Sequence, residues 1–450
     1  MRSTFSKGYR QPHLFPRNRE SSSPTSRPEL QTPSSNESTR RAFAFGNRER
    51  LAGTTTLPIG IDEYRWMIEG EGKSWLARAM ASSDPIHRLI PQLRKALSAE
   101  QTSLLVEQVQ LRARAEQKFS NAQSMYFTAA LLEQATDERV AQLKATRFAR
   151  DTTVADICCG IGGDLMALAQ RGPTLGVDRQ EIACYLATSN VAKAIHDCQI
   201  LEQDALTICL DEMDSVHIDP DRRVGGRRSI RLENHEPARD QLLEMQRRCG
   251  NLAIKLAPAT DTHDDFFQDA ELEWIGSRRD CRQLMSWFGN LSREPNRRTA
   301  TVMSATEEHH WVGEIEEADI TETVGVFLVE PHAPILAADL AGHMANREGL
   351  QRLIPGGGYL TTDRWSDSPF YDTYRVQMSM AYRPKRIRAA LSIRNIGQLT
   401  VKTRGVVISP DQIRRECCPK KGDESAVLFV YRWGERIMAV LTDPKSAAID

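Results

Sequence analysis

The sequence contains no apolar run of about 18 residues, the length that a membrane-spanning helix requires. Its first ten residues are polar and lack the apolar core of a secretory signal. The nine cysteines are an odd number and none forms a Cys-x-x-Cys pair, which argues against a disulfide framework and a zinc ribbon. The ten histidines show no metal-ligand spacing, so we expect no metal. These absences favour a protein of the reducing cytoplasm without membrane contact.

An excess of charge of one sign is also missing. Lys and Arg total 59 and Asp and Glu total 60, which excludes a whole-chain polycation or an acidic tail protein. Charge can still be segregated along the chain, so nucleic acid remains a possible partner. The 450 residues exceed the size of a single hydrophobic core, and two or three domains are expected. No feature of the sequence predicts an oligomeric state.

Composition and periodicity divide the chain into four predicted parts. Residues 1–55 are rich in Ser, Pro and Arg, which predicts a disordered basic tail: a solvated extension, or a tether for RNA. Residues 56–148 carry apolar side chains at three- and four-residue steps, typical of a helical domain. Residues 149–305 alternate short apolar strands with helices, which predicts a parallel sheet covered by helices. Residues 306–450 read as an α+β domain with a hairpin around Trp433-Gly434-Glu435.

A glycine-rich turn is the most informative segment. It follows an apolar strand, opens a helix, and contains Gly160, Gly162 and Gly163. A dinucleotide fingerprint counted from Gly160 would need its third glycine at the position of Leu165. Glycines in such a turn let the backbone approach a ligand closely. The turn therefore predicts a ligand site that differs from a pyrophosphate-binding loop.

Carboxylates accompany this turn. Asp156 and Asp164 flank it, and carboxylates suit a ligand with an ammonium and a sulfonium better than one with two phosphates. Asp178 ends the next predicted strand, where an acidic side chain can accept both ribose hydroxyls of an adenosine. Asp204 follows the third apolar stretch and is placed to meet an adenine amino group. Each carboxylate alone could be a helix cap, but the ordered set predicts a site for S-adenosylmethionine.

With these motifs the sequence resembles the class I S-adenosylmethionine-dependent methyltransferases. More narrowly, it resembles the bacterial members that carry a C-terminal THUMP-like domain. The narrower resemblance covers roughly residues 60–445 and rests on several further segments, among them Met125-Tyr126-Phe127-Thr128, Asp219-Pro220-Asp221-Arg222-Arg223, Lys255-Leu256-Ala257-Pro258, Glu330-Pro331-His332 and Lys402-Thr403-Arg404-Gly405.

The resemblance implies a fold and a class of substrate. The expected fold is α/β: a Rossmann-like, seven-stranded methyltransferase sheet, preceded by a helical domain and followed by a small α+β THUMP-like domain. The expected substrate is RNA, either tRNA or rRNA. The resemblance does not indicate which nucleotide would be methylated.

The corner that faces the methyl group in this class is predicted at Asp219-Pro220-Asp221-Arg222. Enzymes that methylate amino groups commonly carry Asn/Asp-Pro-Pro-aromatic there. At this corner the chain has Asp221 and Arg222 instead, so no aromatic ring follows to stack a base. That difference argues against methylation of an exocyclic amine. Asp219 is the predicted catalytic residue, and Lys255, at the end of the next apolar strand, is its predicted partner.

Two other chemistries stay open. Lys118 and Glu273 would complete a Lys-Asp-Lys-Glu set with Asp219 and Lys255, like that of ribose 2'-O-methyltransferases, although solvated lysines are commoner. Methylation of carbon through a thiol would need a cysteine in the site. The adjacent Cys158-Cys159 pair is near the turn, but small buried residues are the simpler interpretation.

Two basic stretches are candidate RNA surfaces. The first follows Asp219, and the second lies within residues 381–405, which contain no Asp or Glu. The predicted RNA-binding residues are Arg222, Arg223, Arg227, Arg228, Arg386, Arg388 and Lys402. A solvated face paired with acids elsewhere is the alternative. The rival functions are a small-molecule or protein methyltransferase and a non-catalytic RNA-binding module.

Overall fold

The structure is a computed structural model of the chain, and it describes residues 59–192, 194–224, 227–353 and 358–444. The predicted disordered tail, residues 1–55, lies outside this part. The first described elements are helices, as expected: α1 Ile61–Ile68, α2 Gly72–Ala81, α3 Ile86–Leu93, α4 Ala99–Ala115, α5 Ala129–Gln134 and α6 Glu138–Ala145.

These helices form where apolar residues recur at helical spacing. Ser98 begins α4 because its hydroxyl accepts a hydrogen bond from the Gln101 amide, while the Gln101 side chain accepts one from the Ser98 amide. The apolar faces of α1 to α5 pack into one buried cluster that also contains Ile161 and Leu186 from the segment that follows, whereas α6 packs in a second cluster with Val154 and Ala167. The helical region therefore packs directly onto the glycine-rich turn.

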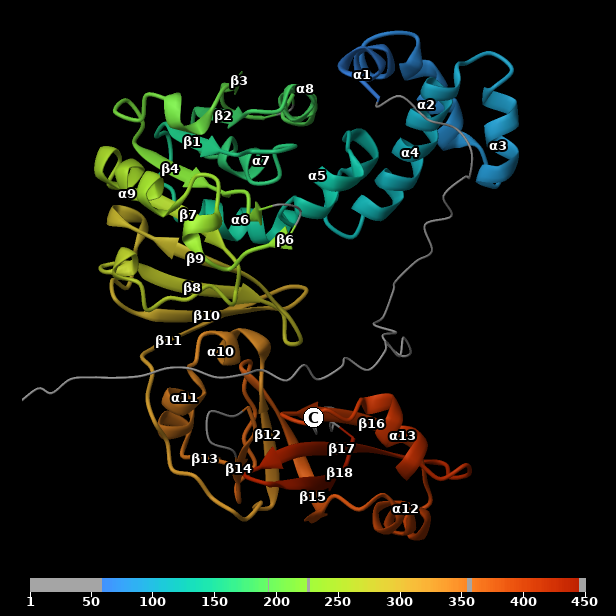
Figure 1. The fold of residues 1–450 in the computed structure, drawn as a ribbon, viewed down its shortest axis with the longest axis vertical. Coiled ribbons are helices and arrows are strands. Elements are labelled where there is room, and N and C mark those ends of the chain that lie inside the picture. The colour runs from blue at the N-terminus through green and yellow to red at the C-terminus, as the bar shows by residue number, and fades with distance from the viewer. Residues whose placement is uncertain (1–58, 193, 225–226, 354–357, 445–450) are drawn as a thin grey trace, which may run out of the picture. The chain divides into compact units, whose positions relative to one another are not determined.

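A nine-stranded sheet follows, in the order β11-β10-β8-β9-β7-β4-β1-β2-β3 (Figure 1). Neighbours from β3 to β7 are parallel, and β9 joins β7 antiparallel. The strands are β1 Val154–Ile157, β2 Thr174–Asp178, β3 Cys198–Glu202, β4 Ser215–Ile218, β7 Leu252–Leu256, β8 Glu271–Gly276, β9 Cys281–Trp287, β10 Arg298–Met303 and β11 Glu308–Gly313. This architecture confirms the predicted α/β class.

The sheet is wider than the seven strands that the resemblance implied. β10 pairs parallel with β8, and β11 pairs antiparallel with β10 through a short turn. The predicted boundary at 305/306 falls inside this hairpin, so the sheet extends to Gly313. Local antiparallel pairing accounts for β11, because a hairpin needs only a short connection to continue the sheet beyond β10.

Three helices and a short ribbon connect the strands. The helix predicted from Gly163 is only one turn, α7 Leu165–Leu168, and the next is α8 Glu181–Asn190. After β4, a two-stranded ribbon, β5 Arg223–Val224 and β6 Arg227–Arg228, precedes α9 Arg239–Arg248.

The C-terminal part is a second, mixed sheet in the order β13-β14-β12-β15-β18-β17-β16. Its strands are β12 Phe327–Pro331, β13 Gln351–Arg352, β14 Leu360–Thr362, β15 Tyr371–Ala381, β16 Ile396–Arg404, β17 Glu424–Trp433 and β18 Arg436–Thr442. Its helices are α10 Ala333–Ala337, α11 Ala341–Glu348, α12 Pro384–Ile393 and α13 Pro410–Cys417.

The predicted hairpin is present in this second sheet. β17 and β18 pair antiparallel up to Trp433 and Arg436, so Gly434 and Glu435 form the turn. Gly434 has φ 57°, a left-handed conformation that favours glycine. α12 and α13 pack their apolar residues on the sheet, which leaves their polar faces outward.

Candidate active site

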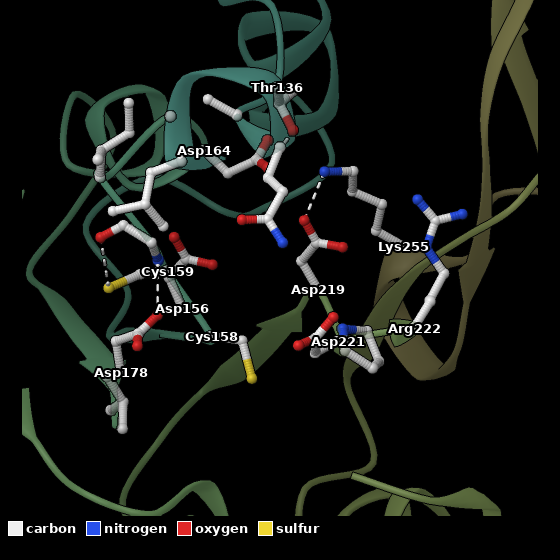
Figure 2. Close-up of a pocket in the computed structure, with 18 of the residues that line it drawn as sticks. Thr136, Asp156, Cys158, Cys159, Asp164, Asp178, Asp219, Asp221, Arg222 and Lys255 are labelled. Atoms are coloured by element: carbon white, nitrogen blue, oxygen red, sulfur yellow. Dashed lines mark hydrogen bonds and ion pairs between the residues drawn. The ribbon is translucent and has the colours of Figure 1, made fainter. Parts of the chain in front are cut away.

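A cavity of about 860 Å³ lies at the carboxyl ends of β1, β2, β4 and β7. Parallel strands bring their carboxyl ends to one edge of a sheet, and ligands of open α/β sheets bind there. Nine carboxylic acids and five basic side chains line the cavity. The lining includes every predicted cofactor and catalytic residue except Gly162, and Figure 2 shows Asp178 and Lys255 on opposite sides of the drawn set.

The glycine-rich turn needs glycine for two different reasons. Gly160 and Gly162 have φ of 56° and 84°, which L side chains rarely adopt. A Cβ on Gly160 would meet only a Leu131 methyl at 3.9 Å, so open space adjoins this residue. A Cβ on Gly163 would lie 3.2 Å from the Thr136 amide nitrogen. The expected close approach at Gly163 is therefore to the protein's own backbone rather than to a ligand.

Asp178 is held by the backbone of the turn. Its Oδ2 accepts a hydrogen bond from the Gly160 amide at 2.9 Å, and its Oδ1 accepts one from the Gln180 amide at 2.9 Å. Each carboxylate oxygen retains a further lone pair for a ligand. Asp204 is exposed and accepts a hydrogen bond from the Leu206 amide through Oδ1, which is the capping role expected of a lone Asp.

A buried polar network forms one wall of the cavity. The Lys144 ammonium lies 2.6 Å from Asp164 Oδ1 and 3.2 Å from His217 Nε2, and His217 Nδ1 lies 2.7 Å from Asp156 Oδ1. The Thr136 hydroxyl donates to Asp164 Oδ2 at 2.6 Å. Because an ammonium has only hydrogens to offer, Nε2 of His217 accepts and Nδ1 carries the hydrogen donated to Asp156.

Burial and ion pairing shift the pKa values in this network. Burial lowers the pKa of Lys144, although Asp164 acts against it. Burial by itself would raise the pKa of Asp164, but the neighbouring Lys144, His217 and Lys255 bring it below its usual range. Burial raises the pKa of Asp156, with His217 opposing. Asp156 Oδ2 is buried without a hydrogen-bond partner among the described residues.

Sequence reasoning did not identify Thr136, Lys144 or His217 as site residues. Thr136 and Lys144 come from the helical region, in which the sequence analysis placed no cofactor-binding residue. His217 stands two residues before Asp219 in an apolar strand, and a polar residue inside such a strand was the available signal.

At the other end, Lys255 and Asp219 form an ion pair, with 2.5 Å between Lys255 Nζ and Asp219 Oδ2 (Figure 2). Burial disfavours the Lys255 ammonium, but Asp219 and Asp164 outweigh it and raise its pKa. Lys255 therefore stays charged and cannot act as a base near neutral pH. The structure brings these two predicted catalytic residues into direct contact.

Lys118 lines the same cavity, but its ammonium has a structural task. Nζ donates to three backbone carbonyl oxygens at the end of α5, those of Leu132, Glu133 and Ala135, at 2.7–3.1 Å. Burial, and next the charge of Lys255, lower the pKa of Lys118 to about 8. Lys118 thus holds the helix end that borders the cavity.

Glu273 does not join Asp219 and Lys255. Met285 of β9 stands between Lys255 and Glu273 in the sheet register. The Glu273 carboxylate instead accepts from Arg147 at 3.0 Å and from the Trp287 indole at 2.9 Å. The four-residue set considered for hydroxyl methylation is therefore not assembled around the cavity.

The two cysteines of the turn are poor nucleophiles. Cys158 lines the cavity, but burial and nearby carboxylates raise its pKa well above the usual range. Burial also raises the pKa of Cys159. A thiolate, which carbon methylation through cysteine requires, is disfavoured at both positions.

The predicted RNA-binding residues are distributed over several places. Arg222 lines the cavity (Figure 2), while the side chains of Arg223, Arg227 and Arg228 fall outside the described part of the chain. Arg386 and Arg388 are exposed on α12, and Arg388 donates to the Arg415 carbonyl of α13 at 3.0 Å.

Lys402 differs from the other predicted RNA-binding residues. Its ammonium is hydrogen-bonded and ion-paired to Glu330 and donates to the Tyr374 hydroxyl at 2.9 Å. It also lies over the rings of Tyr374 and Phe429. This partly buried lysine has less of its charge available to a ligand than Arg386 or Arg388.

The described residues hold neither a metal-ion cluster nor a membrane-spanning helix. They include no group of three or more His, Cys, Asp or Glu side chains arranged for a metal ion. None of their helices has the length and apolar character that a membrane crossing needs.

Comparisons with known proteins agree with this geometry. The sequence profile of the family described as THUMP domain-like matches residues 372–444. Two proteins of Mycobacterium tuberculosis, from strains CDC 1551 and H37Rv, are each 30% identical over 359 residues, covering 77% of this chain and 98% of each relative. Both are named uncharacterized S-adenosylmethionine-dependent methyltransferases.

A solved structure supports the same fold. A protein of Porphyromonas gingivalis W83, described provisionally as a methyltransferase, superposes with a TM-score of 0.68 at 18% identity, covering 86% of this chain and 98% of that one. The chain belongs to the S-adenosylmethionine-dependent methyltransferases. It is an enzyme that uses S-adenosylmethionine, and it carries a THUMP-like domain at its C-terminal end.

Proposed function

We propose that this enzyme methylates RNA, tRNA or rRNA, in the cytoplasm. Two features support RNA: the THUMP-like match at residues 372–444 and a basic surface on α12 within that match. All nine cysteines are free, which suits a reducing compartment.

The basic surface on α12 carries most of the argument for RNA. Its exposed basic residues are Arg383, Lys385, Arg386, Arg388 and Arg394. Residues 381–405 contain no carboxylate, and the charges stand on the outward face of a helix whose apolar residues pack on the sheet. A cationic helix face inside an electrically balanced chain is suited to the phosphate backbone of a nucleic acid.

The cavity divides into a cofactor end and an acceptor end in this proposal. Asp178 and Asp204 would hold the adenosine, and Asp156 with the turn at Gly160 would hold the amino-acid part. The open space at Gly160 and the unpartnered Asp156 Oδ2 fit such a group. Bound there, the cofactor supplies an activated methyl group.

At the acceptor end, Asp219 is the proposed catalytic residue. Its carboxylate can accept a hydrogen bond from the N–H or O–H that receives the methyl group and so orient that atom. Lys255 keeps the carboxylate in place through the 2.5 Å contact. Asp221 and Arg222 follow in place of a proline and an aromatic ring, which favours an acceptor other than a stacked exocyclic amine.

Methyl transfer to RNA tests the proposal. Small RNA from a strain that lacks the gene is incubated with the enzyme and tritiated S-adenosylmethionine, and nucleosides are then resolved by mass spectrometry. We expect labelled RNA with the wild type and none with Asp219→Asn, while both bind the cofactor equally in calorimetry. Asp197→Asn is a matched control, since Asp197 is exposed just before β3 begins, at the opposite edge of the sheet.

Other outcomes would overturn parts of the proposal. Label in protein or in a small molecule, with none in RNA, would move the activity to another substrate class. RNA binding without any transfer would indicate a binding module. Full activity of Asp219→Asn would remove its catalytic role.

A further inference from the structure

A second cavity, of about 500 Å³, adjoins the first, and four of the ten residues that line it are arginines. It lies at the loop between β8 and β9, beside the start of α6 and the end of β10. We call it the arginine hollow, defined by Arg139, Arg278, Arg279, Arg282 and the single carboxylate Asp137. Four cations and one anion line the hollow, which therefore keeps a positive charge even when the neighbouring Asp280 and Asp372 are counted.

The hollow's arginines are only partly neutralised. Arg282 pairs with Asp137 at 3.2 Å and with Asp280 at 3.4 Å, and its side chain is 46% exposed. Arg278 is 3.8 Å from Asp372 and 52% exposed.

The other two arginines have no carboxylate in contact in the part of the chain that the structure describes. Arg139 donates to the Ser304 carbonyl, and Arg279 has no ion-pair partner within the described ranges. Exposed guanidinium groups around a concave surface suit an oxyanion, because each offers a planar fork of donors.

The hollow is continuous with the acceptor end of the first cavity. Asp137 and Arg282 line both cavities. Gln283 follows Arg282 and lines the first cavity, diagonal to Lys255 across the β7–β9 pairing. A ligand that reaches Asp219 can therefore extend past Gln283 into the hollow.

Gln283 is an independent sign of a ligand at this junction. Its side chain is 4% exposed, and its Nε2 has no hydrogen-bond partner among the described residues. A buried amide without a partner costs free energy unless a ligand satisfies it. A carboxamide beside arginines suits a nucleotide, whose base edge offers donors and acceptors and whose phosphate is anionic.

We propose that the arginine hollow binds a backbone phosphate of the RNA strand that carries the acceptor nucleotide, while Gln283 contacts the nucleotide itself. The inference rests on the proposed function, and it adds a contact site within the methyltransferase sheet to the α12 surface. Phosphate contacts fix register and orientation, which the acceptor atom needs in order to meet the methyl group.

The experiment compares two pairs of arginines, each pair consecutive in sequence. Arg278→Gln/Arg279→Gln removes charge from the hollow. Arg247→Gln/Arg248→Gln removes the same charge from exposed residues at the end of α9, where Arg248 contacts Asp211 at the opposite edge of the sheet. Methyl transfer to small RNA from the deletion strain gives kcat and KM as functions of salt, and calorimetry gives cofactor affinity.

We expect the hollow pair to raise the KM for RNA about tenfold and to flatten its salt dependence by about 0.7–0.9 units, the value of one phosphate contact. The cofactor affinity should not change, and the α9 pair should behave as the wild type. Arg279→Gln alone should produce about half of the change in salt slope. If the double variant is unstable, the salt slope of Arg279→Gln alone tests whether the hollow binds a phosphate.

Failure of the phosphate site can be distinguished from failure of the proposed function. If the wild type methylates RNA and the hollow pair, or Arg279→Gln, matches the wild type in KM and salt slope, the phosphate site is rejected and the proposed function stands. If the wild type transfers no methyl group to RNA, the proposed function fails, and the inference fails with it.

Discussion

The proposed cofactor end of the cavity and the arginine hollow are built in opposite ways. At the cofactor end, Asp178 is held by two backbone amides, and Asp156 and Asp164 belong to a network whose lysine is fully buried. In the hollow, beyond the partly buried Lys255–Asp219 pair, Arg278 and Arg282 are half-exposed and loosely paired. The cofactor end is pre-organised by buried contacts, whereas the hollow presents charge to water. Pre-organisation suits one constant small ligand, whereas exposed charge suits a long polyanion whose binding depends on salt.

Lys144 provides the strongest test of this contrast. Lys144→Met would leave Asp164 buried without its cation and His217 without its donor, and breaking a buried ion pair costs about 3–5 kcal/mol. We expect a fall of that size in the free energy of unfolding, measured by urea denaturation. Adding Asp164→Asn should recover part of the loss, since the uncompensated charge disappears. A loss below about 1 kcal/mol would show that the network is not tightly held.

Asp178 tests the cofactor end directly. Asp178→Ala removes hydrogen bonds to a charged group, about 1.5–3 kcal/mol each, so the cofactor should bind about 10- to 100-fold more weakly in calorimetry. RNA affinity should remain unchanged. Asp197→Ala, at the opposite edge of the sheet, is the control. Unchanged cofactor affinity in Asp178→Ala would contradict the assignment of this end.

The α12 surface should respond to salt rather than to cofactor. Arg386→Glu/Arg388→Glu should weaken binding to small RNA and reduce the salt slope by about two units. The cofactor affinity should not change, because α12 belongs to the second sheet's domain. Filter binding at several salt concentrations measures both quantities, and Arg247→Glu/Arg248→Glu serves as the matched control. An unchanged slope would reject α12 as an RNA surface.

Lys118 gives the smallest expected effect, a pH dependence. Its pKa is about 8 in the folded protein and 10.5 ordinarily. Between these values the unfolded chain binds more protons than the folded one, so this lysine makes stability rise with pH. The difference in unfolding free energy between the wild type and Lys118→Met should therefore increase from pH 8 to pH 10.5. Urea denaturation across this window measures it, and a constant difference would contradict the lowered pKa.

Much of the fold could be predicted because local patterns carry it. Short apolar runs mark the strands, apolar residues at three- and four-residue steps mark the helices, and alternation of the two predicts a parallel sheet. The width of the sheet was missed, since β10 and β11 add to an edge that no local pattern marks. The helix expected from Gly163 begins only at Leu165, because the turn that contains Gly162 continues through Gly163.

The site was predictable where it depends on strand ends. Asp178 ends one apolar strand and Asp219 follows another in the parallel part of one sheet, so both side chains lie at its carboxyl edge. The conformation of the loops does not change this placement. The sequence alone thus establishes the turn, the carboxylates beside it and the class of cofactor.

Which charges face each other is a property of the folded chain. Lys144 of α6 contacts Asp164, and the register of β9 separates Glu273 from Lys255. Arg139 of α6 and Arg282 of β9 line the same hollow. These neighbours are far apart in sequence, and an ion pair depends on distances of a few ångströms that spacing along the chain does not specify. Folding therefore decides which carboxylates are neutralised and which arginines remain available for a phosphate.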